Sequence, residues 1–156
     1  MTDVVIRRGD KLDVPFLRSL LAFAYGWHVA AFDTFDISIY HYVDAWGREG
    51  DAALVAAENG HPVGAAWYRL FPESRPGFGF VDEQTPEMTA VVIPSRQGQG
   101  IGSQLVAALV ERAKGDGYPA LSVTVQRGHA DEALLREQGF EQVGEKGDTL
   151  TLRRTL

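Results

Sequence analysis

A glycine-rich turn between a strand-like segment and a helix-like segment is the feature that most constrains this sequence. The segment Glu87–Ile93 is typical of a buried strand, and Pro94 ends it because proline has no amide hydrogen to donate. Gly98, Gly100 and Gly102 follow, and a helical pattern begins at once. The first amides of a helix lack internal partners and lie at the positive end of its dipole. We therefore predict an anion site built from backbone amides and suited to phosphate.

Two common phosphate motifs do not fit this turn. The dinucleotide pattern G-x-G-x-x-G would need glycine at position 103, where the chain has Ser103. A P-loop would need Gly-Lys-Ser or Gly-Lys-Thr after the turn, and neither follows. The alternative reading is that the three glycines only make a tight connection between strand and helix.

Hydrophobic periodicity and turn residues predict the other elements. The expected strands are Val4–Arg8, Ala52–Glu58, Pro62–Leu70, Glu87–Ile93, Ala120–Val125, Phe140–Glu145 and Thr149–Arg154. The expected helices are one capped by Asp13, a short one around Ile37–Trp46, Ile101–Lys114 and Asp131–Gln138. We predict one α/β (α+β) domain over residues 1–156. Its mixed, mostly antiparallel sheet would have about six to seven strands, with a central parallel pair and about four flanking helices.

Composition excludes several classes of protein and site. The 156 residues include no cysteine, which excludes disulfides, thiolate metal sites and a cysteine nucleophile. The four histidines show no metal-ligand spacing, so no metal is expected. A net charge of −6 does not indicate nucleic-acid binding. With neither a signal peptide pattern nor an apolar run long enough to span a membrane, we expect a cytoplasmic protein.

The turn and its flanks resemble the GNAT (Gcn5-related N-acetyltransferase) family. The matching features are Gln97-x-x-Gly100-x-Gly102, the preceding Val92-Ile93-Pro94, the following Leu105, and Gly139-Phe140 after the last helix. The expected order of elements also matches over nearly the whole chain. The resemblance implies a single N-acetyltransferase domain with a GNAT-like fold.

The resemblance also implies how acetyl-CoA would bind as the cosubstrate. The pyrophosphate of coenzyme A would be held by the amides of Gln97, Gly98, Gln99, Gly100, Ile101, Gly102 and Ser103. The pantetheine arm would pair with the backbone of Val91, Val92 and Ile93. In the family the two parallel strands splay apart, and the thioester lies in the gap between them.

The expected reaction is direct attack of a primary amine on the acetyl thioester in a ternary complex. An amine with a pKa of about 10.4 must first lose a proton, so a base is expected, and Glu87 is the candidate. Tyr40, His41 and Tyr42 are its rivals.

The general acid is less well defined by the sequence. Many family members have a tyrosine and an asparagine where this chain has Leu135 and Gly128. Either no residue acts as general acid, or Tyr118 or His129 replaces the missing tyrosine.

Two segments rich in aromatic and acidic residues, Gly26–Asp51 and Phe71–Pro86, are expected to flank the acceptor. Such residues suit a cationic amine, although aromatic side chains also build cores. A small-molecule amine and a peptide amine both fit, and the family resemblance adds the expectation of a homodimer. The leading alternative function is a catalytically silent acyl-CoA-binding sensor or regulatory module, and a nucleotide-binding or purely structural domain comes third.

Overall fold

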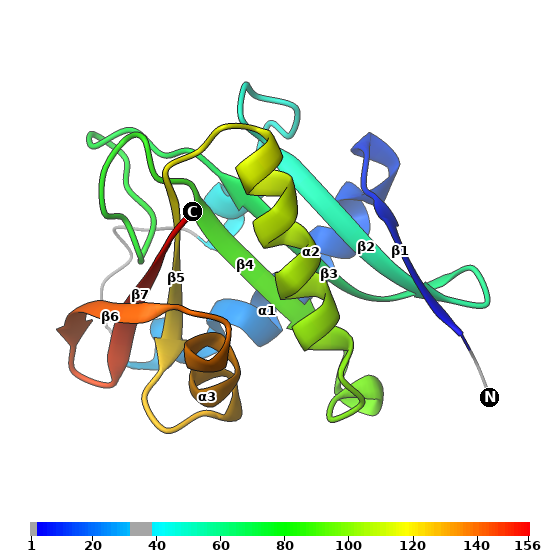
Figure 1. Ribbon diagram of the computed structural model, residues 1–156. Coiled ribbons are helices and arrows are strands. Elements are labelled where there is room, and N and C mark those ends of the chain that lie inside the picture. The colour runs from blue at the N-terminus through cyan, green and yellow to red at the C-terminus, as the bar shows by residue number, and fades with distance from the viewer. Residues whose placement is uncertain (1–2, 32–38) are drawn as a thin grey trace.

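The chain folds around a single seven-stranded sheet (Figure 1). The computed structural model describes residues 3–31 and 39–156, and of residues 27–31 it describes only the backbone. The strands are β1 (Val4–Arg8), β2 (Ala52–Glu58), β3 (His61–Arg69), β4 (Glu87–Val92), β5 (Ala120–Gln126), β6 (Glu141–Lys146) and β7 (Thr149–Thr155). Their order across the sheet is β1-β2-β3-β4-β5-β7-β6, and every pair except β4–β5 is antiparallel. The predicted mixed sheet and its strand count are confirmed.

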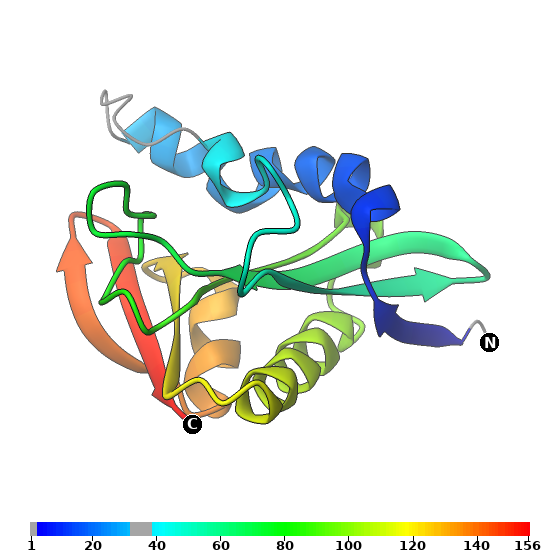
Figure 2. The ribbon, with the colours of Figure 1, turned by 90° about the horizontal axis from the view of Figure 1, so that it is seen from above.

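Helices cover both faces of the sheet (Figure 2). Helix α1 (Val14–Ala31) lies on one face, and α2 (Ile101–Gly115) and α3 (Ala130–Glu137) lie on the other. Because side chains alternate along a strand, each face has its own hydrophobic core. Met88, Leu105, Leu109 and Phe140 belong to the α2 core. The α1 core includes Leu17, Leu21, Tyr42, Trp67 and Val91.

The predicted number of helices was too high. The described residues contain three α-helices, and a short 3-10 helix, η2 (Ile39–Tyr42), lies where a helix around Ile37–Trp46 was expected. Ala45 and Gly47 have positive φ angles of 53° and 107°, so the backbone leaves helical geometry there. Residues 37 and 38 of that prediction lie outside the described residues.

The start of α1 also differs from the prediction. Asp10, not Asp13, is the capping residue: its side chain accepts a hydrogen bond from the amide of Leu12 and caps the 3-10 turn Lys11–Asp13. Asp13 lies inside that turn, where it accepts from the Asp10 amide and pairs with Arg7 at 2.8 Å.

The central parallel pair touches at one point only. Glu87 of β4 is paired with Ser122 of β5, and the Ser122 amide donates to the carbonyl of Pro86 at 3.0 Å. Beyond this point the two strands diverge (Figure 1). Divergence leaves the β5-facing edge of Met88–Val92 without a neighbouring strand, which confirms the predicted splay.

A buried ion pair fixes the segment after η2 against the sheet. Arg69 of β3 pairs with Asp51 at 2.7 Å, and both side chains are almost fully buried. The same guanidinium donates to the backbone carbonyls of His41 and Asp44. A buried charge needs partners of this kind, because the unpaired ion would lose its hydration. The contact holds Tyr42 in place over the α1 face of the sheet.

Candidate active site

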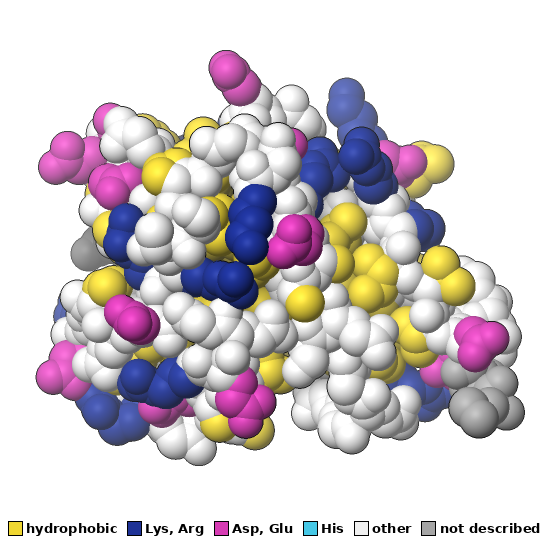
Figure 3. Space-filling view, in the orientation of Figure 1, with side chains coloured by type: hydrophobic (Ala, Val, Ile, Leu, Met, Phe, Trp, Pro, Cys, Tyr) yellow, Lys and Arg dark blue, Asp and Glu magenta, His cyan; other side chains and the backbone are white. Residues whose placement is uncertain are grey.

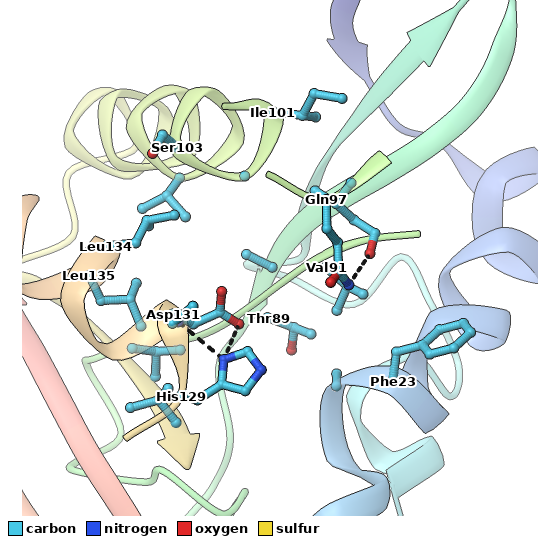
Figure 4. A pocket seen from close by; sticks show the side chains of 18 of the residues that line it. Phe23, Thr89, Val91, Gln97, Ile101, Ser103, His129, Asp131, Leu134 and Leu135 are labelled. Carbon is cyan, nitrogen blue, oxygen red and sulfur yellow. Dashed lines mark hydrogen bonds and ion pairs between the residues drawn. The ribbon is translucent and has the colours of Figure 1, made fainter. Parts of the chain in front are cut away.

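A cavity of about 590 Å³ opens between the diverging strands β4 and β5. It is lined by Met88–Val92 of β4, Val123–Gln126 of β5, the turn before α2, the start of α2, and parts of α1 and α3. Figure 4 shows Phe23 of α1 opposite Leu134 and Leu135 of α3, with Thr89 of β4 between them. The cavity therefore reaches both faces of the sheet through the gap in the parallel pair.

The glycine-rich turn forms one wall of this cavity. Gly98 and Gly100 have φ angles of 78° and 82°, and a Cβ atom at either position would meet nothing within 4 Å. The Gln104 amide donates to the Gly100 carbonyl at 3.1 Å, so the amides of Ile101, Gly102 and Ser103 precede the first helical hydrogen bond. No side chain caps this helix end. These amides are thus available to an anion at the positive end of the α2 dipole.

Eight of the ten residues predicted to bind the cofactor line the cavity: Val91, Val92, Gln97, Gly98, Gly100, Ile101, Gly102 and Ser103. Ile93 and Gln99 do not line it. The Ile93 amide instead donates to the carbonyl of Val63, which extends the sheet. The Gln97 side chain donates to the Val92 carbonyl at 3.1 Å, which ties the turn to the end of β4.

Glu87 lies at the point where β4 and β5 meet, and its carboxylate is buried. The residue is 1% exposed, and the Tyr42 hydroxyl and the Gly79 amide both donate to the carboxylate. Burial raises the pKa of Glu87 to about 7, against a smaller lowering effect of these two hydrogen bonds. A carboxyl with such a pKa changes charge near neutral pH, as a general base should.

Two glycines allow a loop to cover this carboxylate. A Cβ atom on Gly77 would lie 2.4 Å from a Glu87 oxygen, and one on Gly79 would lie 2.8 Å from the Thr124 methyl group. The absent side chains of these two glycines are what let the Phe71–Pro86 loop seal the buried end of the site.

The three alternative candidates for the general base have different surroundings in the structure. Tyr40 is exposed, with the Arg18 guanidinium over its ring. The ring of His41 bonds to the carbonyl of Arg75, and burial lowers its pKa. Tyr42 alone contacts Glu87.

The candidates for a general acid are also far apart. Tyr118 packs against Tyr68 near the end of α2 and does not line the cavity. His129 lines the cavity, and its Nδ1 accepts from the Asp131 amide at the start of α3 (Figure 4). Leu135 also lines the cavity, so the family's tyrosine position faces the site with an apolar side chain.

Sequence reasoning assigned no role to Phe23 or Thr89 and placed Tyr25 only among the aromatic residues near the acceptor, yet all three lie on the α1 side of the cavity. Phe23, Tyr25 and Thr89 all line it, and the Tyr25 hydroxyl lies 2.5 Å from Thr89 Oγ1. Phe23 and Tyr25 are two positions apart on α1, and the helical pattern gave no reason to separate them from the core. No short motif marks any of the three.

The described aromatic residues of the segments expected near the acceptor lie in two places. Tyr25 stacks on Tyr42 with ring centroids 4.2 Å apart, and Phe71 and Phe78 pack beside Tyr42. Trp46 instead lies against Arg69. The side chains of Trp27, Phe32, Asp33, Phe35 and Asp36 lie outside the described residues.

The outer surface on the α2 side has a mixed character. Basic and acidic side chains are interspersed there, and hydrophobic atoms show between α2 and β1 (Figure 3). Among the side chains that the structure describes, no three His, Asp or Glu are grouped as around a metal ion. None of the described helices is long and apolar enough to cross a membrane.

Comparison with known proteins decides the family. The sequence pattern of the Acetyltransferase (GNAT) family matches residues 15–140. The chain belongs to the GNAT acetyltransferase family. Two curated relatives, from Pseudomonas paraeruginosa and Pseudomonas aeruginosa, are L-methionine sulfoximine/L-methionine sulfone acetyltransferases. Each is 30% identical over 151 residues, which covers 90% of this chain and 86% of the relative.

Solved structures of this family share the fold. A ribosomal-protein-alanine N-acetyltransferase from Brucella melitensis is 29% identical with a TM-score of 0.67, covering 97% of this chain and 99% of that chain. A proposed acetyltransferase from Salmonella typhimurium, solved with its cofactor acetyl-CoA, is 25% identical with a TM-score of 0.72, covering 98% and 94%. The predicted GNAT-like fold is confirmed.

Proposed function

We propose that this GNAT protein is an acetyl-CoA-dependent N-acetyltransferase that acts on the primary amine of a small molecule. One observation carries the proposal. A single cavity reaches from the free amides at the start of α2 towards the buried carboxylate of Glu87. The amide end suits the phosphate groups of the donor, and the carboxylate end suits an amine that must lose a proton. The cytoplasm, where we predict the protein to lie, would supply the donor.

The residues around the cavity suit coenzyme A. The amides from Gly98 to Ser103 would hold the pyrophosphate, with Gly98 and Gly100 leaving room for it. The free edge of Met88–Val92 would pair with the amide groups of the pantetheine arm, as a neighbouring strand would. The acetyl thioester would be the electrophile delivered to the gap between β4 and β5.

The acceptor class is proposed from the Pseudomonas relatives. Both are named for L-methionine derivatives, which are small molecules with a free α-amino group. We therefore propose a small amino-acid-like amine as the acceptor. A peptide amine is the competing acceptor, since the Brucella neighbour is named for a ribosomal protein.

Glu87 is the proposed general base. The α-amino group of such an acceptor is mostly protonated at pH 7, because its pKa is about 8 or higher, so a base near the site would help to remove the proton. The neutral amine would attack the carbonyl carbon, and the C–S bond would then break. A thiol pKa of about 8.5 makes the thiolate a fair leaving group, so the reaction would proceed with Leu135 in the family's acid position.

The proposal is tested by binding and turnover on the same protein sample. Calorimetric titration with acetyl-CoA and CoA is expected to show binding, and free thiol should appear with small α-amino acids and their sulfoximine or sulfone analogues. Thiol release with peptides alone would move the acceptor to the peptide class. Binding without thiol release from any amine would favour the silent acyl-CoA sensor, and no binding at millimolar ligand would contradict both.

A further inference from the structure

Glu87 is poorly placed to touch an acceptor amine directly. It is 1% exposed and is not among the residues that line the cavity. One carboxylate oxygen accepts from the Tyr42 hydroxyl and the other accepts from the Gly79 amide at 3.0 Å. If this carboxylate acts as the base, another group must bring the proton to it.

Two tyrosines connect the carboxylate to the cavity. The Tyr42 hydroxyl donates to Glu87 and accepts from the Phe78 amide at 2.7 Å. The Tyr25 ring stacks on Tyr42 with centroids 4.2 Å apart and an angle of 22° between the ring planes. Tyr25 itself lines the cavity, beside Thr89. The two stacked phenols thus lie between the cavity and the carboxylate.

We infer that Tyr25 and Tyr42 relay the acceptor's proton from the cavity to Glu87. This inference rests on the proposed function, because it requires an amine acceptor in the cavity. Tyr25 is the group that would touch the amine, and Tyr42 acts through its contact with Glu87. Thr89 positions the Tyr25 hydroxyl.

The proton transfer is balanced without any further reactant. As the amine nitrogen bonds to the carbonyl carbon, a nitrogen-bound proton passes to the Tyr25 oxygen. The Tyr25 proton passes to Tyr42, and the Tyr42 proton passes to Glu87. The C–S bond electrons leave with the thiolate, and each tyrosine ends as a neutral phenol. Release of the proton from Glu87 to solvent restores the site.

The charges around the relay favour Glu87 as the final proton acceptor. Burial and the nearby Glu87 charge raise the pKa of both Tyr25 and Tyr42 well above the usual value, so neither phenol is a stable anion. The groups facing the carboxylate are the Tyr42 and Tyr25 phenols and the Gly79 amide. Within the described residues no Lys or Arg forms an ion pair with Glu87, so its proton affinity stays high.

Phenylalanine variants test the relay. Tyr42→Phe and Tyr25→Phe remove one hydroxyl each and keep the rings of the stack. Tyr68→Phe is the matched control, because the buried Tyr68 donates to Asp116 near the end of α2, away from the cavity. CoA affinity, measured by calorimetry, is expected to be unchanged in all three and serves as the test of folding.

The rates and their pH dependence separate a relay from a purely structural contact. With an amine from the turnover panel, kcat of Tyr42→Phe and Tyr25→Phe is expected to fall roughly 10²–10⁴-fold, while Tyr68→Phe stays near wild type. The wild-type rate should level off above neutral pH. The rates of the two relay variants should instead rise about tenfold per pH unit, because only the ionisation of the amine itself then limits them.

Each outcome of these measurements either supports or contradicts the proton relay. If wild type turns over amines and Tyr42→Phe keeps its rate and pH profile, the relay is wrong while the proposed function stands. If no protein, wild type included, releases thiol, both are wrong. Should Tyr42→Phe lose CoA binding through misfolding, Glu87→Gln takes its place, because glutamine still accepts hydrogen bonds but takes up no proton. Wild-type kcat in Glu87→Gln would overturn the relay.

Discussion

The two ends of the cavity are built by different means. At the α2 end, the cavity is lined by the short stretch Gly98, Gly100, Ile101, Gly102 and Ser103, and the amides of its last three residues precede the first helical hydrogen bond. At the α1 end, the chemistry rests on Tyr25, which lines the cavity, and on Tyr42 and Glu87 behind it, and these side chains come from three separate elements. The difference teaches that a binding site made of backbone has a local sequence signature, while a site made of distant side chains does not.

The two ends should also respond differently to mutation. Backbone amides survive most side-chain changes, and only a residue that alters the turn or crowds the anion should matter. Buried side chains that hold one another have no such tolerance, because removing one partner leaves another polar group unpaired.

The free energy of unfolding of the protein should depend on pH through Glu87. Burial raises the pKa of this carboxyl from 4.5 to about 7, so the native state keeps the proton to higher pH than the unfolded state. The resulting stabilisation is complete below about pH 4.5 and is lost as the pH rises through 7. We expect wild type to lose about 3 kcal/mol relative to Glu87→Gln between pH 4 and pH 8.

Urea unfolding of both proteins at several pH values measures this difference. His41 and every other titrating group are common to both proteins, so their contributions cancel. A stability difference that stays constant across the range would show that Glu87 titrates normally and would remove the basis of its proposed role.

At the α2 end, Gly100→Glu should weaken binding of CoA about 100-fold. Gly100 has a φ of 82°, which strains any residue with a Cβ atom, and a carboxylate there would repel the pyrophosphate. Gln99→Glu is the matched control, because it adds the same charge one residue away, at a position that does not line the cavity. Calorimetry on both variants gives the comparison, and equal affinities would refute the placement of the phosphate.

The smallest effect is expected from Gln97, one of the side chains that brace the turn. Gln97→Ala removes the hydrogen bond to the Val92 carbonyl, which is worth about 0.5–1.5 kcal/mol. CoA affinity should therefore fall by about tenfold or less. A much larger loss of affinity in the same titration would mean that side chains, not backbone amides, dominate this end of the cavity.

The sequence was a good guide wherever structure follows from local pattern. The seven predicted strands are present within one or two residues, and Asn59 and Gly60, with φ angles of 52° and 80°, form the tight turn between β2 and β3. The strand–turn–helix unit at Pro94–Ile101 has the predicted free amides. Short-range periodicity and turn chemistry determine these features, so a single sequence reveals them.

The end of the site that the Phe71–Pro86 loop covers could not be predicted from local sequence patterns. Gly77 and Gly79 are needed because Glu87 and Thr124 lie beneath them, and that contact joins segments far apart in the chain. Tyr25 has the spacing of a core residue on α1, and only the fold shows that it also reaches the cavity. A 3-10 helix replaced the expected helix before Trp46 because positive φ angles at Ala45 and Gly47 turn the chain away.

The most direct test of the proposed catalytic end is the pH dependence of kcat/KM for wild type and Glu87→Gln with one small amine. We expect wild type to show an ionisation with a pKa near 7, as the pKa of Glu87 of about 7 requires. The variant should lose this ionisation and roughly 10²–10⁴-fold in rate, with unchanged CoA affinity. A variant with the wild-type rate and the same ionisation would contradict the assignment of Glu87 as the base.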